Sequence, residues 1–178
     1  MSHAFISYMR TDSNKIDKLA AELKKKGIEV WLDREQIDPA TNWEDAIRKA
    51  IKDGSYFIAC FSESYMTKRK SGMNEEIDIA LKEMKKLHYD TPYLISVLLD
   101  KKSEVPDREV LTGTTMRSYQ WVDLSNSNEW QQGVDKIAHV ILETKKKFEK
   151  SNLFVGETNC IEARRYKETY IKTDGRRC

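Results

Sequence analysis

Residues 4–32 read AFISYMRTDSNKIDKLAAELKKKGIEVWL, and this stretch decides the fold class. Ala4–Tyr8 and Ile28–Leu32 are short apolar runs, which are typical of buried strands. Between them, apolar residues recur at helical spacing and a glycine follows as the C-cap: Ile16, Leu19, Ala20, Leu23 and Gly27. The stretch therefore predicts a strand, a helix and a second strand, as in a parallel α/β sheet.

The same alternation continues to residue 142. Three further apolar runs predict strands at Tyr56–Phe61, Tyr93–Leu99 and Tyr119–Leu124. Stripes of apolar residues predict more helices, one behind a capping box at Thr41–Glu44 and one from about Asn74. Strands that are apolar throughout are covered on both faces, so we expect a flavodoxin-like α/β fold, a five-stranded parallel sheet of order 2-1-3-4-5 with helices on both faces. Residues 100–117 have no clean helical stripe, and we expect them to be irregular.

The composition supports one folded core and excludes several classes of protein. Leu, Ile, Val and Phe make up 39 of the 178 residues, about 22%, just above the roughly 20% below which chains tend to be disordered. The sequence has no apolar run of membrane-spanning length and no secretory pattern, so we expect no membrane partner. The odd count of three cysteines and the three scattered histidines predict neither disulfides nor a metal site, and they favour a cytoplasmic location.

Charge divides the chain at residue 142. Residues 1–142 hold 21 Lys and Arg against 23 Asp and Glu, a net of −2, whereas residues 143–178 hold 10 against 6, a net of +4. We therefore expect one domain over residues 1–142 and a basic C-terminal extension, of unknown role, over residues 143–178. No aromatic stacking pattern accompanies the arginines of this extension, so nucleic acid is not expected as a partner.

In a sheet of this order, ligands bind outside the carboxyl ends of strands one and three, where the strand order reverses. SYMRTD at residues 7–12 and SESY at residues 62–65 follow those strands, and a nearby helix brings Glu75 and Glu76. The sequence has no GxGxxG, no P-loop, no glycine-rich flavin loop and no carboxylate pair of a phospho-accepting receiver. The groups that remain to form a site at this edge are a tyrosine, an arginine, the long connection over residues 33–42 and a helical glutamate. Such a site can bind a nucleotide by stacking and charge while offering it a carboxylate.

Four motifs occur in a fixed order along the chain. They are FISY at Phe5–Tyr8, the Leu32-Asp33 pair with the loop after it, WEDAI at Trp43–Ile47, and NEEIDIAL at Asn74–Leu81. Together they resemble the Toll/interleukin-1 receptor (TIR) domain family over residues 3–142. Many members cleave the nicotinamide–ribose bond of NAD⁺, giving nicotinamide and ADP-ribose or a cyclic ADP-ribose isomer, and become active on self-assembly. The resemblance therefore implies an NAD⁺ nucleosidase with two partners, NAD⁺ and other TIR domains.

The resemblance also implies roles for individual residues. Register with the family pattern x-E-I-x-x-A-L makes Glu76 the catalytic glutamate and Glu75 its neighbour. Because cleavage builds positive charge on the ribose, a carboxylate stabilises it, and nicotinamide leaves without a second acid. NAD⁺ is then the substrate, and no cofactor or metal is expected. Enzymatic relatives often have Trp four residues before this glutamate, where this chain has Gly72. The expected substrate-binding residues are Tyr8, Arg10, Asp33, Trp43 and Ser62.

Each residue also has a plainer interpretation. A glutamate near a helix start is usually solvated, Arg10 is equally suited to a surface ion pair, Trp43 to the core and Ser62 to a helix cap. Two other functions stay open. One is a non-enzymatic signalling module that acts by homotypic TIR–TIR association, and the other is a nucleoside-transferring enzyme of similar fold. A role in antiviral defence is an expectation from the family alone.

Overall fold

The computed structural model describes residues 3–32, 45, 48–49, 56–68, 71–86 and 93–143. All but residue 143 belong to the first of two units of the chain, Met1–Leu142. The predicted capping box at Thr41–Glu44, most of the connection after β2 and most of the C-terminal extension lie outside the described residues. Within the described ranges, no helix is long and apolar enough to cross a bilayer.

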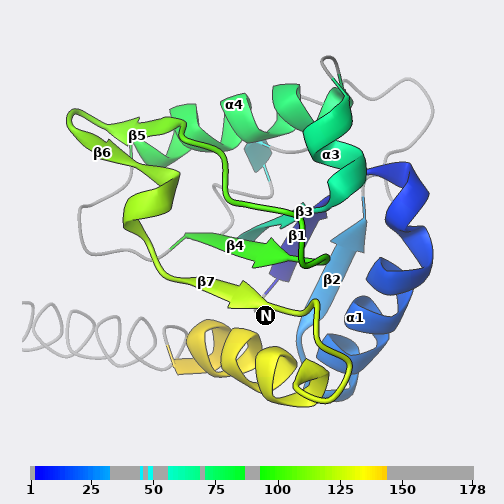
Figure 1. Ribbon diagram of the computed structural model, residues 1–178. Helices are drawn as coiled ribbons and strands as arrows, with labels where there is room; N and C mark the ends of the chain where they lie inside the picture. The colour runs from blue at the N-terminus through cyan, green and yellow to red at the C-terminus, as the bar shows by residue number, and fades with distance from the viewer. Residues whose placement is uncertain are drawn as a thin grey trace, which may run out of the picture. The chain divides into compact units, whose positions relative to one another are not determined.

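A five-stranded parallel sheet forms the centre of this unit (Figure 1). Its strands stand in the order β2-β1-β3-β4-β7, and every neighbouring pair runs parallel. The strands are β1 His3–Ser7, β2 Glu29–Leu32, β3 Tyr56–Phe61, β4 Leu94–Leu98 and β7 Trp121–Asp123. The flavodoxin-like class and the order 2-1-3-4-5 are thereby confirmed. The reversal of strand order lies between β1 and β3.

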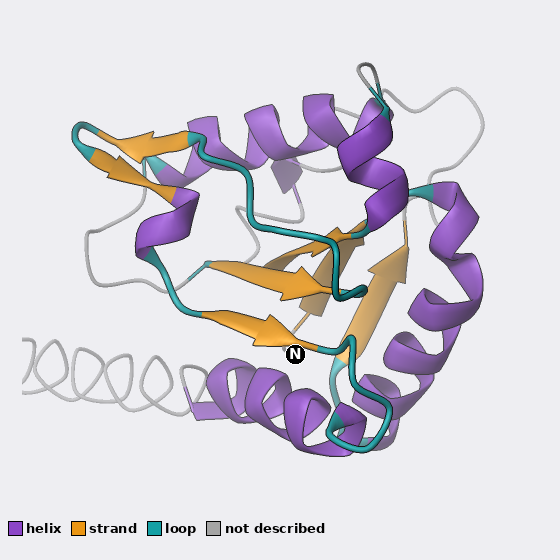
Figure 2. Ribbon diagram, in the orientation of Figure 1, coloured by secondary structure: helices purple, strands orange, loops and turns teal. Residues whose placement is uncertain are grey.

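Helices cover both faces of the sheet (Figure 2). The 3₁₀ turn η1 (Arg10–Asp12) leads into α1 (Ser13–Lys25), and α3 spans Glu63–Thr67 and α4 spans Gly72–Met84. A last helix covers residues 130–143. After α1, Gly27 takes a φ of 79°, a left-handed conformation that glycine adopts without strain, and the N–H of Ile28 bonds back to Leu23. The predicted glycine cap is confirmed.

Alternate residues of each strand face opposite sides, so the sheet separates two apolar cores. Ala4 and Ile6 of β1 pack in one core with α1 and the last helix. Phe5, between them, faces the other core with α4 and stacks on Phe57 of β3 at 5.7 Å between ring centroids. Because both faces are covered, all six residues of β3 are buried, as its unbroken apolar run predicts.

The expectation of irregular structure over residues 100–117 is wrong in part. This segment forms an antiparallel hairpin of β5 (Glu109–Leu111) and β6 (Thr114–Thr115), which turns at Gly113 with a φ of 76° and leads into the 3₁₀ turn η2 (Met116–Ser118). Val110 and Met116 are fully buried and anchor the hairpin in the core that contains α4. Strands of three and two residues are too short for a period of two to show in the sequence.

Candidate functional site

Glu76 is a buried carboxylate on α4. Glu76 is 5% exposed, and the hydroxyl of Ser7, at the end of β1, donates a hydrogen bond to Oε2 of Glu76. Ser7 itself is fully buried. The helix begins at Gly72, two residues before the expected start, because Ser71 has extended backbone angles and serves as the N-cap. Glu76 is therefore the fifth helical residue, and a side chain of β1, rather than the helix end, holds its carboxylate.

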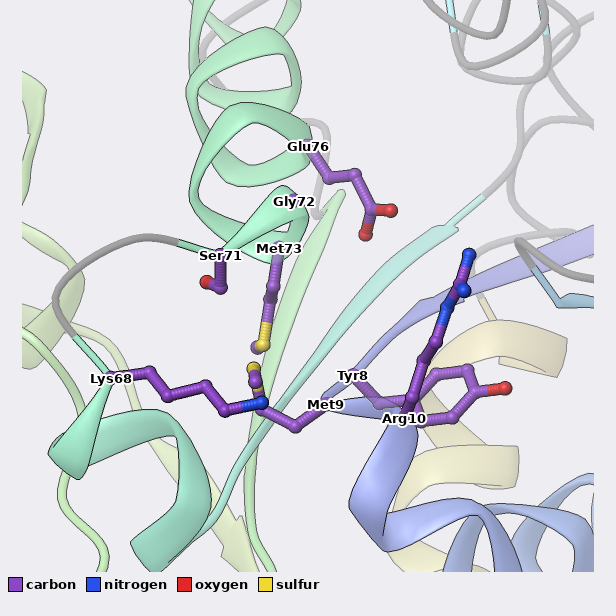
Figure 3. A pocket seen from close by; sticks show the side chains of 8 residues that line it. All are labelled: Tyr8, Met9, Arg10, Lys68, Ser71, Gly72, Met73 and Glu76. Carbon is purple, nitrogen blue, oxygen red and sulfur yellow. The ribbon is translucent and has the colours of Figure 1, made fainter.

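A cavity of about 260 Å³ opens beside this carboxylate (Figure 3). It lies outside the carboxyl end of β1, where the strand order reverses. Three segments line it, with these residues: Tyr8, Met9, Arg10, Lys68, Ser71, Gly72, Met73 and Glu76. The cavity thus lies at the edge of the sheet where the sequence predicts the site.

Among the described residues, two cations and one carboxylate line this cavity. Arg10 in η1 and Lys68 after α3 are exposed, whereas Glu76 is buried. In Figure 3 the side chains of Arg10 and Glu76 extend into the cavity from opposite walls, while the Tyr8 hydroxyl points away from the carboxylate. A ligand with both an anionic and a cationic part would find a counter-charge for each.

The first turn of α4 offers further polar groups to the cavity. The Ser71 side chain does not cap the helix, and its buried hydroxyl oxygen has no hydrogen-bond partner among the described residues. The first backbone N–H groups of a helix have no intrahelical acceptor and attract anions. Met9 and Met73, which are 5% and 3% exposed, form the apolar part of the cavity wall.

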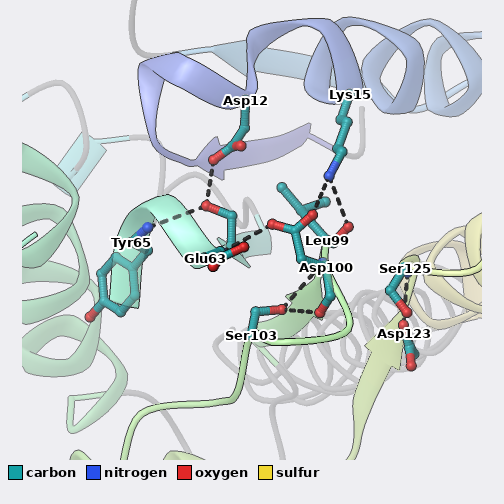
Figure 4. Close-up of polar contacts among 10 residues, drawn as sticks. Asp12, Lys15, Glu63, Tyr65, Leu99, Asp100, Ser103, Asp123 and Ser125 are labelled. Atoms are coloured by element: carbon teal, nitrogen blue, oxygen red, sulfur yellow. Dashed lines mark hydrogen bonds and ion pairs between the residues drawn. The ribbon is translucent and has the colours of Figure 1, made fainter. Parts of the chain in front are cut away.

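Ser62, which the family resemblance implies as a substrate-binding residue, lies at a helix cap and not at the cavity. It is fully buried at the end of β3, where its Oγ accepts the backbone N–H of Tyr65 at 3.3 Å and caps α3. The same hydroxyl donates to Asp12 at 2.5 Å, so it joins the loops after β1 and β3. Figure 4 labels its two partners, Asp12 and Tyr65. Ser62 does not line the cavity. The plainer interpretation, a helix cap, is the one this geometry supports.

The structure thus brings together three of the six site residues expected from the sequence: Tyr8, Arg10 and Glu76. Asp33 and Trp43 lie outside the described residues. Two residues that sequence reasoning missed, Lys68 and Ser71, also line the cavity. Lys68 belongs to the basic run Lys68-Arg69-Lys70, whose composition is typical of a solvated loop, so no local signal singles it out.

Among the described residues, the one cysteine does not add to the site. Cys60 is the last but one residue of β3 and has no exposed surface, and burial, followed by the charge of Asp12, raises the pKa of its thiol far above the ordinary value. It is therefore no thiolate nucleophile at neutral pH. The described part of the chain also holds no group of three or more His, Cys, Asp or Glu side chains that could bind a metal ion.

The comparison with protein families settles the classification. The model of the TIR domain matches residues 4–138, three quarters of the chain. The chain belongs to the TIR domain family. The match ends inside the last helix, before the basic extension, and it contains every described residue that lines the cavity of this TIR domain. Comparison with curated proteins finds no match.

Among solved structures, this TIR domain is similar to the crystal structure of a prokaryotic SEFIR domain. The two share 19% sequence identity with a TM-score of 0.50, and the alignment covers 78% of this chain and 97% of the SEFIR chain. At this identity the similarity concerns the fold alone. It agrees with the parallel sheet and strand order described above.

Proposed function

We propose that this TIR domain is an NAD⁺ glycohydrolase whose catalytic carboxylate is Glu76. The observation that carries the proposal is the buried Glu76 carboxylate, held by Ser7 beside a cavity at the reversal of strand order. The family includes enzymes of this kind, and the position of Glu76 in the chain matches that of their glutamate.

The chemistry requires one well-placed negative charge. The bond from C1′ of the ribose to the nicotinamide nitrogen breaks, and its electron pair leaves with that nitrogen, which becomes neutral. Positive charge then develops on C1′ and the ring oxygen, and Glu76 stabilises it. Water adds to C1′ and releases one proton to the solvent. In the cyclic product, the adenine base takes the place of water.

The cavity supports binding of the reacting end of the substrate. Its volume of about 260 Å³ is below the roughly 300–1,000 Å³ of pockets that enclose a whole drug-sized ligand. We therefore assign it the nicotinamide riboside, with the positive ring near Glu76. Arg10 and Lys68 then bind the diphosphate, and the adenosine extends beyond these walls. TIR–TIR association would complete such an open site, so we expect the rate per molecule to rise with protein concentration.

The test compares Glu76→Gln with Glu75→Gln in the full chain. Both replacements remove one charge from neighbouring positions of α4, but Glu75 is exposed and does not line the cavity. Nicotinamide release from NAD⁺ is measured over a series of protein concentrations, with thermal melting as the control for folding. We expect Glu76→Gln to lower the rate at least 100-fold and Glu75→Gln to change it less than about threefold.

Two results would overturn the proposal: equal rates for folded Glu76→Gln and the wild type, or no nicotinamide release by the wild type at any concentration. The second result would favour the signalling module that acts by TIR–TIR association, to which Gly72 in place of the tryptophan of many enzymatic relatives also points. Light scattering on the same samples would then show association without turnover.

A further inference from the structure

Arg108, immediately before β5, binds the first turn of α4. Its Nη2 donates to Oδ1 of Asn74 at 2.7 Å, and its Nη1 donates to the backbone oxygen of Asn74 at 3.3 Å and to Oδ1 of Asp78 at 2.8 Å. The hydroxyl of Tyr65 also donates to Oδ1 of Asn74, at 2.9 Å. One guanidinium thus spans two successive turns of the helix that carries Glu76.

The backbone of Arg108 is itself fixed. Its carbonyl accepts the N–H of Met116 at 2.8 Å, and Met116 and Val110 are fully buried in the core they share with Ile77 of α4. The guanidinium is half-buried, with 26% of the side chain exposed. Its hydrogen bonds therefore join a fixed segment to α4.

These bonds lie on the opposite side of the helix from Ser7. Asn74 and Asp78 are four residues apart and share one face, whereas Glu76, two residues from each, lies about 200° around the axis. Arg108 thus holds α4 from one side, and Ser7 holds the Glu76 carboxylate from the other.

The first turn of α4 needs such support. Its N-cap, Ser71, makes no side-chain hydrogen bond to the helix, and the first backbone N–H groups of any helix lack intrahelical acceptors. A turn held so weakly by its own cap frays unless other groups hold it. Asn74 receives that support through its side chain and its backbone.

We propose that Arg108 is a positioning residue, which fixes the first turn of α4 and through it the Glu76 carboxylate in the cavity. The inference rests on the proposed NAD⁺ cleavage. Displacement of a catalytic group by about 1 Å can cost 100-fold in rate. Loss of Arg108 should therefore act on the chemical step more than on substrate binding.

The test compares Arg108→Ala with Arg117→Ala. Arg117 is a matched control from the same segment, since its guanidinium bonds Val105 and Glu104, which lie outside α4. We expect Arg108→Ala to lower kcat about 10- to 100-fold with KM changed less than threefold, and Arg117→Ala to leave both near the wild-type values. Arg108→Lys should recover part of kcat through one charged hydrogen bond. If Arg108→Ala folds poorly, Asn74→Ala replaces it in the test. This variant removes the side-chain partner of Arg108, keeps a good helix former in α4, and should show the same loss of kcat.

Hydrogen exchange separates this inference from the proposed function. We expect the amides of residues 75–77 to exchange faster in Arg108→Ala than in Arg117→Ala, while those of β3 are unchanged. If the wild type fails to cleave NAD⁺, this measurement still tests the hold on α4. Equal exchange in the two variants, or equal loss of kcat, or a kcat defect that disappears at high protein concentration, would overturn the role of Arg108.

Discussion

The hydroxyl of Ser7, at the carboxyl end of β1, donates a hydrogen bond to the Glu76 carboxylate on α4, 69 residues further along the chain. Both residues are buried, so neither group has water as a ready substitute partner. The bond fixes the orientation of the carboxylate beside the cavity. It also gives the FISY motif a physical role beyond strand formation.

Replacing Ser7 by Ala removes this bond and leaves the charge of Glu76 in place. We expect kcat for nicotinamide release to fall about 10-fold with little change in KM, and the free energy of unfolding to fall by about 1 kcal/mol, because the buried carboxylate loses the hydrogen bond from Ser7. Steady-state kinetics and urea denaturation measure the two effects. Ser7→Thr, which keeps a hydroxyl, is the control, and a kcat equal to that of wild type in folded Ser7→Ala would contradict the role of the bond.

Arg10 and Lys68 line the same cavity from different elements, and both are exposed. If they bind the diphosphate, Arg10→Ala and Lys68→Ala should each raise KM for NAD⁺ about 3- to 10-fold, with stability unchanged within 0.5 kcal/mol. The rise should shrink with added salt, because exposed charges are screened. Lys102→Ala, which removes an exposed lysine paired with Glu63 away from the cavity, is the control. An unchanged KM in both variants would show that Arg10 and Lys68 do not bind the diphosphate in this cavity.

Gly72 occupies the position at which enzymatic relatives often have tryptophan. A Cβ at Gly72 meets no atom of the described residues within 4 Å, so a side chain can start from this position without a clash. We expect Gly72→Trp to lower KM for NAD⁺ about 2- to 10-fold, since an aromatic contact contributes about 0.5–1.5 kcal/mol. Gly72→Ala controls for the change in helix propensity. A KM equal in the two variants would show that a ring at this position does not touch the substrate.

Gly133 of the last helix packs too closely on β7 to accept a side chain. A Cβ there would clash with Leu124 Cδ2 and approach the backbone oxygen of Asp123 to 3.3 Å. We expect Gly133→Ala to lower the free energy of unfolding by about 1–3 kcal/mol, despite the better helix propensity of alanine. Gly72→Ala, in open space, should be neutral or stabilising. Urea denaturation measures the free energy of unfolding of both variants. A gain of stability in Gly133→Ala as well as in Gly72→Ala would contradict the predicted clash at Gly133.

Asp100, after β4, carries a pH-dependent share of the stability. Burial tends to raise its pKa, but hydrogen bonds from Lys15 and the Glu63 N–H, with the charge of Lys15, outweigh burial and hold the pKa below its ordinary value. Lys15 lies 2.5 Å from the carboxylate, which is 28% exposed. With the pKa lowered in the folded state, the ionised form stabilises the protein above the unfolded pKa, and this stabilisation is lost as pH falls through the folded pKa.

We therefore expect Asp100→Asn to cost about 1 kcal/mol of unfolding free energy at pH 7. The difference from wild type should decrease below about pH 4, near the ordinary pKa of aspartate. Denaturation curves from pH 7 to pH 2.5 measure it, with the exposed Asp107→Asn as control. A difference that stayed constant over this range would mean that the carboxylate charge of Asp100 is not involved.

Some features follow from the sequence because their signals are local. The five strands are short apolar runs, and α1 has a periodic stripe that ends at Gly27, so their class and positions were predictable. The choice of Glu76 over Glu75 came from family register, and burial separates the two residues in the structure. The site at the reversal of strand order followed from the fold class.

Other features depend on residues far apart in the chain. Ser62 has the same sequence neighbourhood whether it binds a substrate or caps a helix, and only its bonds to Tyr65 and Asp12 show the cap. Lys68 belongs to an ordinary basic run in the sequence, and only the packing of α3 and α4 shows that it lines the cavity. Arg108 lay in a segment expected to be irregular, and its bonds reach 30 and 34 residues back to α4.

The sequence by itself determined the parallel sheet and its order, and it predicted the edge for the site and the glutamate in family register. The tertiary structure decided that Ser7 of β1 bonds this glutamate and that Arg10 of η1 and Lys68, at the end of α3, line the same cavity. The physical reason is that periodicity and caps are properties of a few adjacent residues. A hydrogen bond or a cavity wall depends on how separate elements pack, and in this TIR domain two apolar cores on opposite faces of one sheet fix that packing.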